Sequence, residues 1–600
     1  MEFRTVNYFT SSPLRFIWIF ILFLGLVFGA YHKTLSFPFV HDDVIFIQQN
    51  STLDEWNLSE IFLGRGQEDK LSESVNSYYR PVLEIYYRVI NLFFGRSAAA
   101  FHFFNIFIHA LNGFLVFLIV HILLNKKNLW GCVFVAALFL LHPIQTEAVA
   151  CISGVSNLLS GFFILLSFYL FERLRRSENK QERVRCYVLS LMMFVLALLS
   201  KEQAVILPFL ALSSMLFLNR DQNRQKWGGW KKLSGFFAVM VVYFGLRRVI
   251  TGSSVVSAMQ FSQEFWLRIF AIPRTLLMYL KILFFPVDLH YYRSTDILES
   301  NTLSAVILLI LVAGLSVIIL KSSKERKRLL TFSVAWFIVC LLPFLNFLPL
   351  VNEYSLILTS EHFLYLPIIG GLFFFLVLLS PSDFGKVNFK KEIIWFFLIA
   401  LFFFMSMKQS LIWRGEIPLF KKTLVHEPNF GRVRFLLGKA YLSEGKYAQA
   451  SIELEKSLII MQSYLQKVVP ESESAQVYLF YVREINGFLG LCFDELGQFQ
   501  HALKHYQRAL SLSPENPKFL NYLGFHFFRQ GEKAQARQYF QQAVDFGGND
   551  VNALNILAIC YIEAGQKNKA MQIFKSILDG DPSNFSAQQN LFQLEKSLLK

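Results

Sequence analysis

Two adjacent carboxylates follow the first long apolar stretch of the chain, in the segment His41-Asp42-Asp43. A carboxylate can act as a general base toward a hydroxyl, and a second charge beside it raises its pKa or helps to hold a cation. The plain alternative is a solvated loop, because acidic residues are common where a chain leaves an apolar segment. Adjacent residues of an extended segment point to opposite sides, so only one of the pair can face a substrate directly. We favour Asp42 for that position, with Asp43 orienting the loop or a cation.

Other charged and polar residues fall near the ends of apolar stretches, on the same predicted side as the two carboxylates. Arg and Lys at such places can bind phosphate oxygens through charge-assisted hydrogen bonds. Each residue taken alone could equally be an anchor at a helix end, with a long side chain that reaches toward water. Their gathering on one side favours a binding site, because Lys and Arg normally accumulate on the cytoplasmic side. The candidate binding residues are His41, Arg80, His142, Glu147, Lys201, Glu202, Arg247, Arg293, Glu361 and His362.

Long apolar runs must position these residues. Hydrophobic residues make up 54% of the 600 residues and aromatic residues 16%, more than soluble proteins of this length usually carry. About eleven runs approach the roughly twenty residues that a membrane-spanning helix needs. The first run is long for the apolar core of a signal peptide, so we expect it to be retained. The runs cover residues 14–31, 101–124, 131–150, 157–172, 187–200, 204–219, 233–250, 302–320, 329–347, 363–380 and 392–408.

A further run, 264–285, contains Arg268, Arg274 and Lys281, and each charge would be costly in the middle of a membrane. If this run does not cross, all five basic loops of the chain lie on the cytoplasmic side. We therefore expect an interfacial or re-entrant hairpin here. The amino terminus is then cytoplasmic, and the loop 32–100 and everything after about residue 409 are extracytoplasmic. The basic loops lie at 126–127, 173–185, 220–232, 321–328 and 386–391.

From about residue 430 the chain becomes polar and a 34-residue repeat begins. Small residues recur at Gly490, Gly524 and Ala558, and each is followed three residues later by an aromatic residue. A second small residue and a second aromatic recur farther along each unit, as in Ala536 and Phe540. This pattern is typical of tetratricopeptide (TPR) repeats, in which small residues let two helices approach closely and aromatic residues fill the space between them.

The sequence thus predicts an all-α protein, with a polytopic membrane domain over 1–412 and a TPR α-solenoid over 413–600. The net charge of +15 fits basic cytoplasmic loops, and the chain contains no zinc-finger or RNP-type motif, so we expect no nucleic-acid partner. The six cysteines form no CxxC pair, which argues against a metal knuckle or a redox motif. No residues are assigned to a metal, although a divalent cation beside the carboxylates stays open.

Carboxylates beside cations at a membrane face suit one reaction well. A sugar that is linked to a lipid phosphate can be attacked by a hydroxyl, and the phosphate is already a good leaving group. The attacking hydroxyl needs a base, and the departing phosphate needs Arg or Lys to stabilise its charge.

Several short motifs also resemble a known family, the transmembrane and TPR-containing O-mannosyltransferases. The similarity covers nearly the whole chain in the same order, with Trp413 before the repeats and the TPR repeats at the end. Two positions depart from the family pattern, because Val155 and His362 stand where the family often has Arg. The matching motifs are Phe39-Val40-His41-Asp42-Asp43, Tyr79-Arg80-Pro81, Leu141-His142-Pro143, Thr146-Glu147-Ala148-Val149, Ser200-Lys201-Glu202-Gln203, Leu283-Phe284-Phe285-Pro286, Glu361 and Leu364-Tyr365-Leu366-Pro367.

The resemblance implies a membrane domain with the type C glycosyltransferase fold. It further implies transfer of a sugar, such as mannose, from a polyprenyl-phosphate carrier to an extracytoplasmic acceptor, with inversion. Asp42 or Asp43 is then the catalytic carboxylate, and the TPR array binds a protein acceptor. The departures at Val155 and His362 concern the phosphate contacts and hence the identity of the donor.

Two other functions remain as alternatives. A non-catalytic, membrane-anchored TPR scaffold for envelope assembly would explain the repeats but not the polar residues around Asp42 and Asp43. A ligase for lipid-linked oligosaccharides would place its key residues in a large late loop, whereas the largest loop of this membrane domain is the first. A transporter is disfavoured, because few charged residues fall in the middle of the apolar runs.

Overall fold

A computed structural model of the chain describes residues 13–63, 79–125, 127–218, 229–251, 263–294, 302–345, 357–380, 389–468, 470 and 472–598. The described chain is helical apart from one short β pairing, which confirms the predicted fold class. It divides into two compact units, Met1–Lys422 and Thr423–Lys600. This division falls after the predicted boundary at 412, because Trp413 and Phe420 are buried in the first unit.

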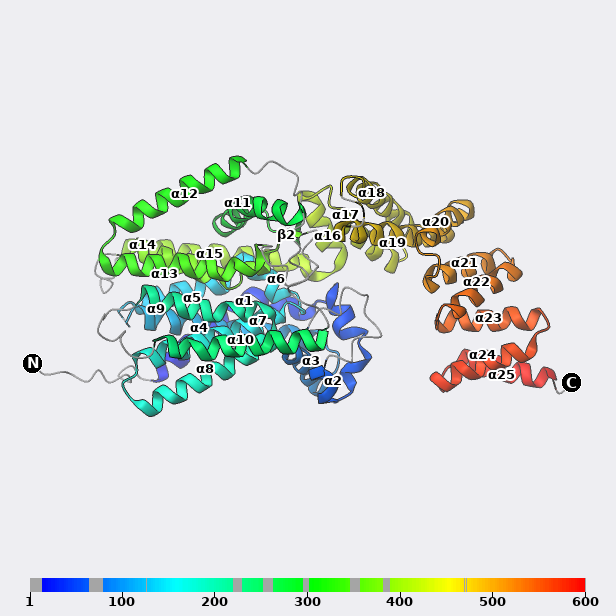
Figure 1. Cartoon of the computed structure of the whole chain (residues 1–600), viewed down its shortest axis with the longest axis horizontal. Coiled ribbons are helices and arrows are strands. Elements are labelled where there is room, and N and C mark those ends of the chain that lie inside the picture. The colour runs from blue at the N-terminus through cyan, green and yellow to red at the C-terminus, as the bar shows by residue number, and fades with distance from the viewer. Residues whose placement is uncertain are drawn as a thin grey trace, which may run out of the picture. The chain divides into compact units, whose positions relative to one another are not determined.

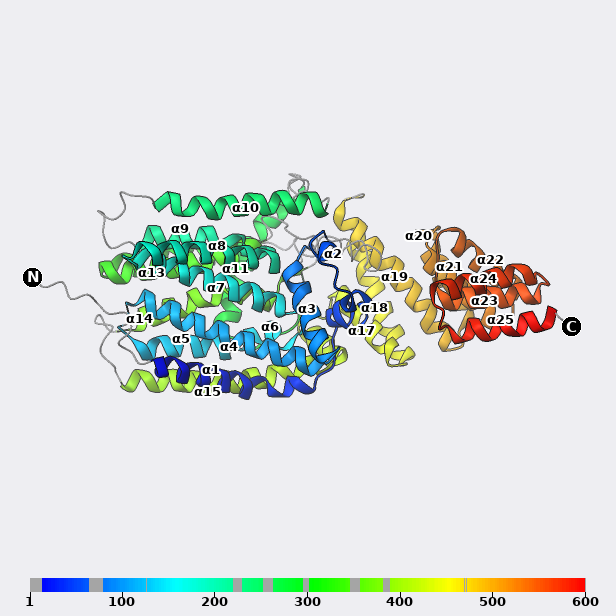
Figure 2. The same cartoon turned by 90° about the horizontal axis from the view of Figure 1, so that it is seen from below.

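The first unit consists of long helices that run side by side (Figures 1 and 2). They are separated by shorter helices, namely α2 (Leu58–Leu63), α3 (Pro81–Phe94), α5 (Leu129–Leu141), α6 (Thr146–Ala150), α9 (Leu207–Phe217), α14 (Pro367–Leu379) and α16 (Glu416–His426). Strand β1 (Arg293–Ser294) pairs with β2 (Ile357–Thr359) in antiparallel register. The long helices are α1 (Pro13–Tyr31), α4 (Ala98–Leu123), α7 (Val155–Arg176), α8 (Lys180–Ser200), α10 (Gly229–Thr251), α11 (Gln263–Phe284), α12 (Thr302–Lys321), α13 (Lys324–Leu341) and α15 (Phe389–Ser410).

In the part of the chain that the structure describes, each of the eleven predicted apolar runs is largely helical, and the run 131–150 is broken into α5 and α6. Within the described residues, eight helices are long and apolar enough to cross a membrane. A ninth span results if α5 and α6, which are bent by 49° relative to each other, count together. The remaining two runs, in α9 and α14, form shorter apolar helices. The chain is therefore an integral membrane protein with many spans.

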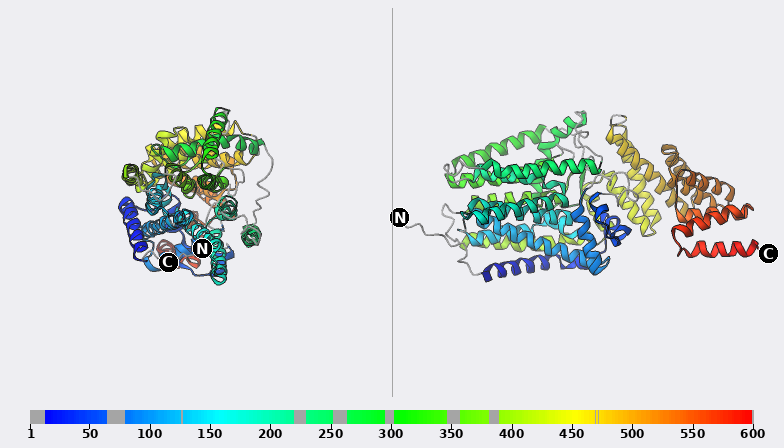
Figure 3. Two further views of the ribbon diagram at one scale, coloured as in Figure 1. Left: turned by 90° about the vertical axis from the view of Figure 1, so that its left-hand side faces the viewer. Right: turned by 60° about the horizontal axis from the view of Figure 1, so that its bottom comes forward.

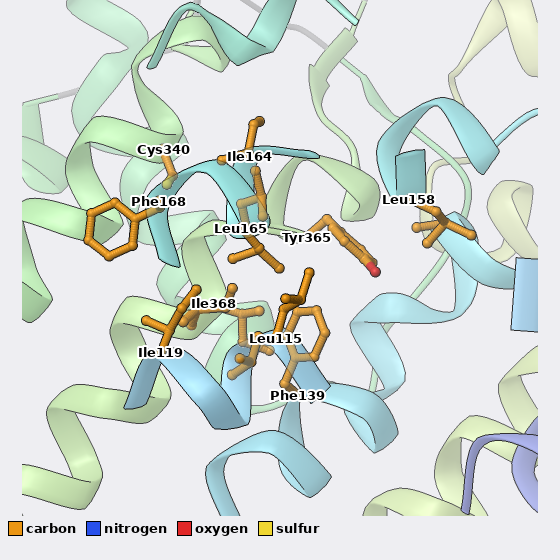
Figure 4. Close-up of a cluster of buried hydrophobic side chains, with 14 of the residues drawn as sticks. Leu115, Ile119, Phe139, Leu158, Ile164, Leu165, Phe168, Cys340, Tyr365 and Ile368 are labelled. Atoms are coloured by element: carbon orange, nitrogen blue, oxygen red, sulfur yellow. The ribbon is translucent and has the colours of Figure 1, made fainter. Parts of the chain in front are cut away.

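The centre of the first unit is packed where α4, α5, α7 and α14 meet. Figure 4 shows Leu115 and Phe139 facing Leu165 and Ile368 across this core. Helix α12 differs, because none of its residues is buried although almost all of them are apolar. Such a surface is stable only against lipid or another protein, as expected at the outside of a membrane bundle.

The predicted hairpin at 264–285 is wrong in shape. These residues form one helix, α11, of 22 residues with Pro273 inside it. A proline removes one backbone hydrogen bond and bends a helix, but it does not reverse the chain. Helix α11 is not among the helices that qualify as membrane spans by length and composition. Parts of the basic loops, including Lys126, 219–228 and 381–388, lie outside the described residues.

The second unit is a stack of antiparallel helix pairs (Figures 1 and 3). The predicted repeat register is confirmed, since Phe540 and Phe574 are buried and a Cβ on Gly524 would lie 2.6 Å from the Phe540 ring. Helices α18 (Tyr447–Leu465) and α19 (Glu473–Glu495) are longer than the helices of the later repeats. The helices are α17 (Gly431–Ser443), α18 (Tyr447–Leu465), α19 (Glu473–Glu495), α20 (Phe499–Leu512), α21 (Pro517–Arg529), α22 (Lys533–Asp545), α23 (Val551–Glu563), α24 (Lys567–Gly580) and α25 (Phe585–Leu598).

Candidate functional site

The two adjacent carboxylates occupy different environments. Asp43 is buried, and its Oδ1 accepts a hydrogen bond of 2.7 Å from the backbone N–H of Ser153. Its Oδ2 accepts a second bond, of 3.2 Å, from the N–H of Val40. The Asp42 side chain is 42% exposed. Asp42 is therefore open to a ligand, whereas Asp43 ties its own loop to the segment around Ser153.

The surroundings of Asp43 alter its acidity. Burial raises the pKa of Asp43 to about 6, although the hydrogen bonds from Ser153 and Val40 oppose the shift. The charge of Asp42 adds a smaller increase. The described residues hold no group of three or more His, Cys, Asp or Glu side chains that could bind a metal ion.

His41 contacts Asp42 and is fixed from three sides. Its backbone is in the left-handed region, with φ of 56°, and its N–H donates to Oε1 of Glu416 at 3.0 Å. The imidazole ring meets the rings of Tyr291 and Phe420 edge to face, at centroid distances of 5.7 and 5.8 Å. Its Nε2 lies 3.4 Å from Oδ1 of Asp42. These contacts suit a residue that positions Asp42.

A cationic group gathers at the carboxyl ends of α8 and α10. Arg80 binds Glu202 through two parallel bonds of 3.0 and 2.7 Å. The charges of Arg247 and Lys201 also act on the Glu202 carboxylate. Lys201 donates a bond of 2.7 Å to Oδ1 of Asn157. Three cations thus surround one carboxylate, and this arrangement favours an anionic ligand.

A third group forms between α6 and the segment that precedes α14. The Glu147 carboxylate lies 2.8 Å from Nδ1 of His362 and accepts a bond of 2.9 Å from the hydroxyl of Ser360. The neighbouring Glu361 accepts a bond of 2.6 Å from the N–H of His290 and lies 3.7 Å from Nη2 of Arg293. The pairing of β1 with β2 sets Arg293 opposite Thr359 and thus beside this segment.

Arg293 has unused hydrogen-bonding capacity. Its Nη2 donates to the carbonyl of Asp288 at 2.8 Å, whereas Nη1 is buried without a partner among the described residues. Burial raises the pKa of Glu361; the charge of Arg293 opposes this shift and that of Glu147 adds to it. A protonated Glu361 would leave the charge of Arg293 uncompensated, which again suits an anionic ligand.

One short segment, 147–157, connects the three groups. Glu147 contacts His362, the N–H of Ser153 binds Asp43, and Asn157 binds Lys201. The structure thus brings together residues that are predicted from five separate motifs. Ser153 was not predicted because it acts through its backbone, and Asn157 because it begins an apolar run.

His142 does not join this site. Its Nδ1 accepts the N–H of Ile144 at 3.2 Å, and its Nε2 lies 3.0 Å from the carbonyl of Leu283. Its ring packs against Phe402 at a centroid distance of 4.6 Å. Both nitrogens are occupied by backbone groups, so the predicted phosphate contact by His142 is replaced by a structural one, which caps the break between α5 and α6.

The fold and the site define a multi-span membrane protein with a TPR array. Three stretches match sequence models of the tetratricopeptide repeat, at residues 431–458, 489–551 and 527–593. Among solved structures, a crystal structure of MamA is similar, with 22% identity, a TM-score of 0.22, and coverage of 27% of this chain and 85% of that chain.

Among curated proteins, the relatives are protein O-mannosyl-transferases, which confirms the resemblance inferred from the motifs. The chain is 29% identical to the human protein O-mannosyl-transferase TMTC3 over 188 residues, which are 31% of this chain and 20% of that protein. It is 24% identical to a protein O-mannosyl-transferase of Caenorhabditis elegans over 457 residues, or 74% of this chain and 63% of that protein. The match to the human relative thus spans only a fifth of its length.

Proposed function

We propose that this chain is an inverting membrane glycosyltransferase, which moves a sugar from a polyprenyl-phosphate carrier to a protein hydroxyl. The observation that carries the proposal is the open carboxylate of Asp42 at the same end of the helical domain as the cationic groups. The names of the relatives support mannose as the sugar and protein as the acceptor.

In this reaction the acceptor hydroxyl attacks the anomeric carbon from the face opposite the phosphate. The new carbon–oxygen bond forms while the bond to the phosphate oxygen breaks, and the phosphate leaves with the bonding electrons. The hydroxyl proton passes to Asp42, which acts late, as the phosphate departs. Arg293 and the cations around Glu202 stabilise the leaving phosphate. Because there is one displacement, the anomeric configuration inverts.

The topology that fits this reaction puts the site and the TPR array outside the cytoplasm. The carboxyl end of α10 carries Arg247, whose charge acts on Glu202, and α11 is followed nine residues later by Arg293 beside Glu361, so both helices end near the site. The chain between them makes no net crossing, which supports five basic loops on the opposite side. A reporter fused after residue 600 that is active only in the cytoplasm would refute this topology.

In this proposal, the membrane domain, residues 1–412, catalyses the sugar transfer, and the TPR domain, residues 413–600, binds the protein acceptor. Stacked helix pairs provide an extended concave surface, which suits a polypeptide. A lipid-linked sugar and a protein acceptor are then the two partners of the chain.

Mass spectrometry of membrane and secreted proteins from cells with and without this chain tests the proposal. We expect specific peptides to lose a hexose when the chain is absent and to regain it with the wild-type chain but not with Asp42→Asn. If no peptide changes, or if Asp42→Asn restores all of them, the enzyme assignment fails. If the chain is needed for assembly of an envelope complex but no peptide loses a hexose in its absence, the scaffold function is favoured.

A further inference from the structure

The turn at residues 151–154, between α6 and α7, holds Asp43 through the N–H of Ser153. Within the turn, the N–H groups of Gly154 and Val155 donate to the carbonyl oxygens of Cys151 and Ile152 at 3.2 and 3.0 Å. A carbonyl oxygen has two lone pairs, so further donors from outside the turn can fix its shape.

Asn105 supplies them from α4. Its side chain is fully buried, and its Nδ2 lies 3.4 Å from the carbonyl oxygen of Val149, 3.0 Å from that of Cys151 and 3.3 Å from that of Ile152. The Tyr86 hydroxyl lies 3.5 Å from Oδ1 of Asn105. One carboxamide thus contacts three carbonyl groups of the segment that leads into Ser153.

We infer that Asn105 is a positioning residue for the sugar transfer proposed above, acting through this turn on Asp43 and on the first turn of α7. The N–H of Ser153 reaches Asp43 only if the turn keeps its shape. Asn157, three residues after the turn, carries the bond to Lys201. Asn105 therefore fixes the base-bearing loop and one phosphate-facing cation together, without touching either substrate.

A second buried amide on the same helix provides a matched control. Asn112 lies seven residues farther along α4, is also fully buried, and donates to the Leu158 carbonyl and to the Tyr365 hydroxyl at 2.9 and 2.8 Å. It contacts the first turn of α7 and the core, but not residues 151–154. Replacing either amide by leucine removes a buried donor from α4, so a loss of general stability should affect both variants alike.

Cys151 offers a probe of the turn that does not depend on activity. It is partly exposed, whereas the other five cysteines are buried. Burial raises the pKa of the Cys151 thiol well above its usual value, with the nearby Asp43 charge adding to the shift, so its reaction with N-ethylmaleimide should be slow. Release of the turn should expose the thiol and speed the reaction.

The experiment compares wild-type chain, Asn105→Leu and Asn112→Leu, each full length in native membranes and normalised for folded protein. We measure the labelling rate of Cys151 by mass spectrometry, and kcat and KM with polyprenyl-phosphate mannose as donor. For Asn105→Leu we expect Cys151 to label several-fold faster, kcat to fall by roughly tenfold to a hundredfold, and KM for the donor to rise, because Asn157 and with it Lys201 lose their position. For Asn112→Leu we expect the wild-type labelling rate of Cys151, because Asn112 does not contact residues 151–154.

Three results would overturn the inference: an unchanged Cys151 rate in Asn105→Leu, an unchanged kcat despite faster labelling, or equal changes in both variants. If the wild-type chain transfers no mannose, the proposed function fails instead, and the labelling rates still decide whether Asn105 holds the turn. The two failures are therefore distinguishable.

Discussion

Oε1 of Glu416 accepts a hydrogen bond of 3.0 Å from the backbone N–H of His41. Glu416 begins α16, the helix that leads into the repeats, and His41 immediately precedes Asp42. Two segments that are 375 residues apart in sequence therefore meet beside the proposed base. A non-glycine residue with φ of 56° needs such support, because this conformation is unfavourable for most side chains.

We expect Glu416→Ala to lower turnover by roughly tenfold, because the His41 backbone and with it Asp42 lose their fixed position. Glu416→Gln keeps an oxygen that can accept the same bond and should retain most activity. Rates of sugar transfer at equal protein amounts check this. Equal rates for the wild-type chain and Glu416→Ala would show that the contact does not matter for catalysis.

Asp42→Asn should lower turnover by roughly 10²–10⁴, because it keeps the shape of the side chain but removes the base. Asp43→Asn should also impair transfer, since an amide nitrogen would face the N–H of Val40 or of Ser153 in place of an accepting oxygen. Donor binding should change much less in both variants. If both variants transfer sugar at the wild-type rate, the assignment of the active site to Asp42 and Asp43 is wrong.

Activity and stability should respond to pH in opposite directions through Asp43. Its pKa is raised to about 6, so turnover should fall as the pH falls through about 6 and Asp43 loses its charge. The unfolded chain has the lower pKa, so the folded state binds the proton more tightly and gains stability from it as the pH falls. Asp42, Cys151 and Tyr87 are the titratable groups around Asp43.

The measurement is the pH profile of kcat alongside thermal unfolding of the same preparations. Asp43→Asn should lose the inflection near pH 6 in any residual activity and should lose the matching change in melting temperature. An inflection that persists in Asp43→Asn belongs to another group.

Arg293→Met should raise KM for the lipid-linked donor by roughly tenfold or more, because a guanidinium with a free buried nitrogen is lost. Arg293→Lys keeps the charge but not the planar set of donors, so its KM should lie between those of the wild-type chain and Arg293→Met. Arg96 provides a control, since its partly exposed guanidinium pairs with the exposed Asp54. If Arg96→Met raises KM as much as Arg293→Met does, the effect comes from the loss of one positive charge anywhere on the domain and not from a donor contact at Arg293.

Phe540→Ala should reduce the stability of the TPR unit by about 3–5 kcal/mol, because the ring is buried against Gly524. The control is Phe546→Ala, whose ring is 47% exposed and whose loss should have little effect. Chemical unfolding of residues 423–600 measures both. A wild-type unfolding curve for Phe540→Ala would contradict the repeat register.

The predictions from sequence were most accurate where a pattern is local. The 34-residue spacing located the repeats, since each repeat needs a small residue where its two helices touch, as Gly524 and Phe540 illustrate. The apolar runs located the helices in the same way. The hairpin at 264–285 was predicted wrongly, because charges such as Lys281 argue against a buried span but do not specify a turn.

The sequence by itself determined the class of the protein and most of its polar site residues. Burying an apolar helix in lipid and stacking repeats are requirements that residue order alone can express. Only the tertiary structure separated Asp42 from Asp43 and joined both to Asn105, Ser153 and Glu416. Those contacts run between distant segments and partly through backbone groups, which carry no side-chain signal in the sequence. Burial, which sets the pKa of Asp43, likewise exists only once the distant segments have packed around it.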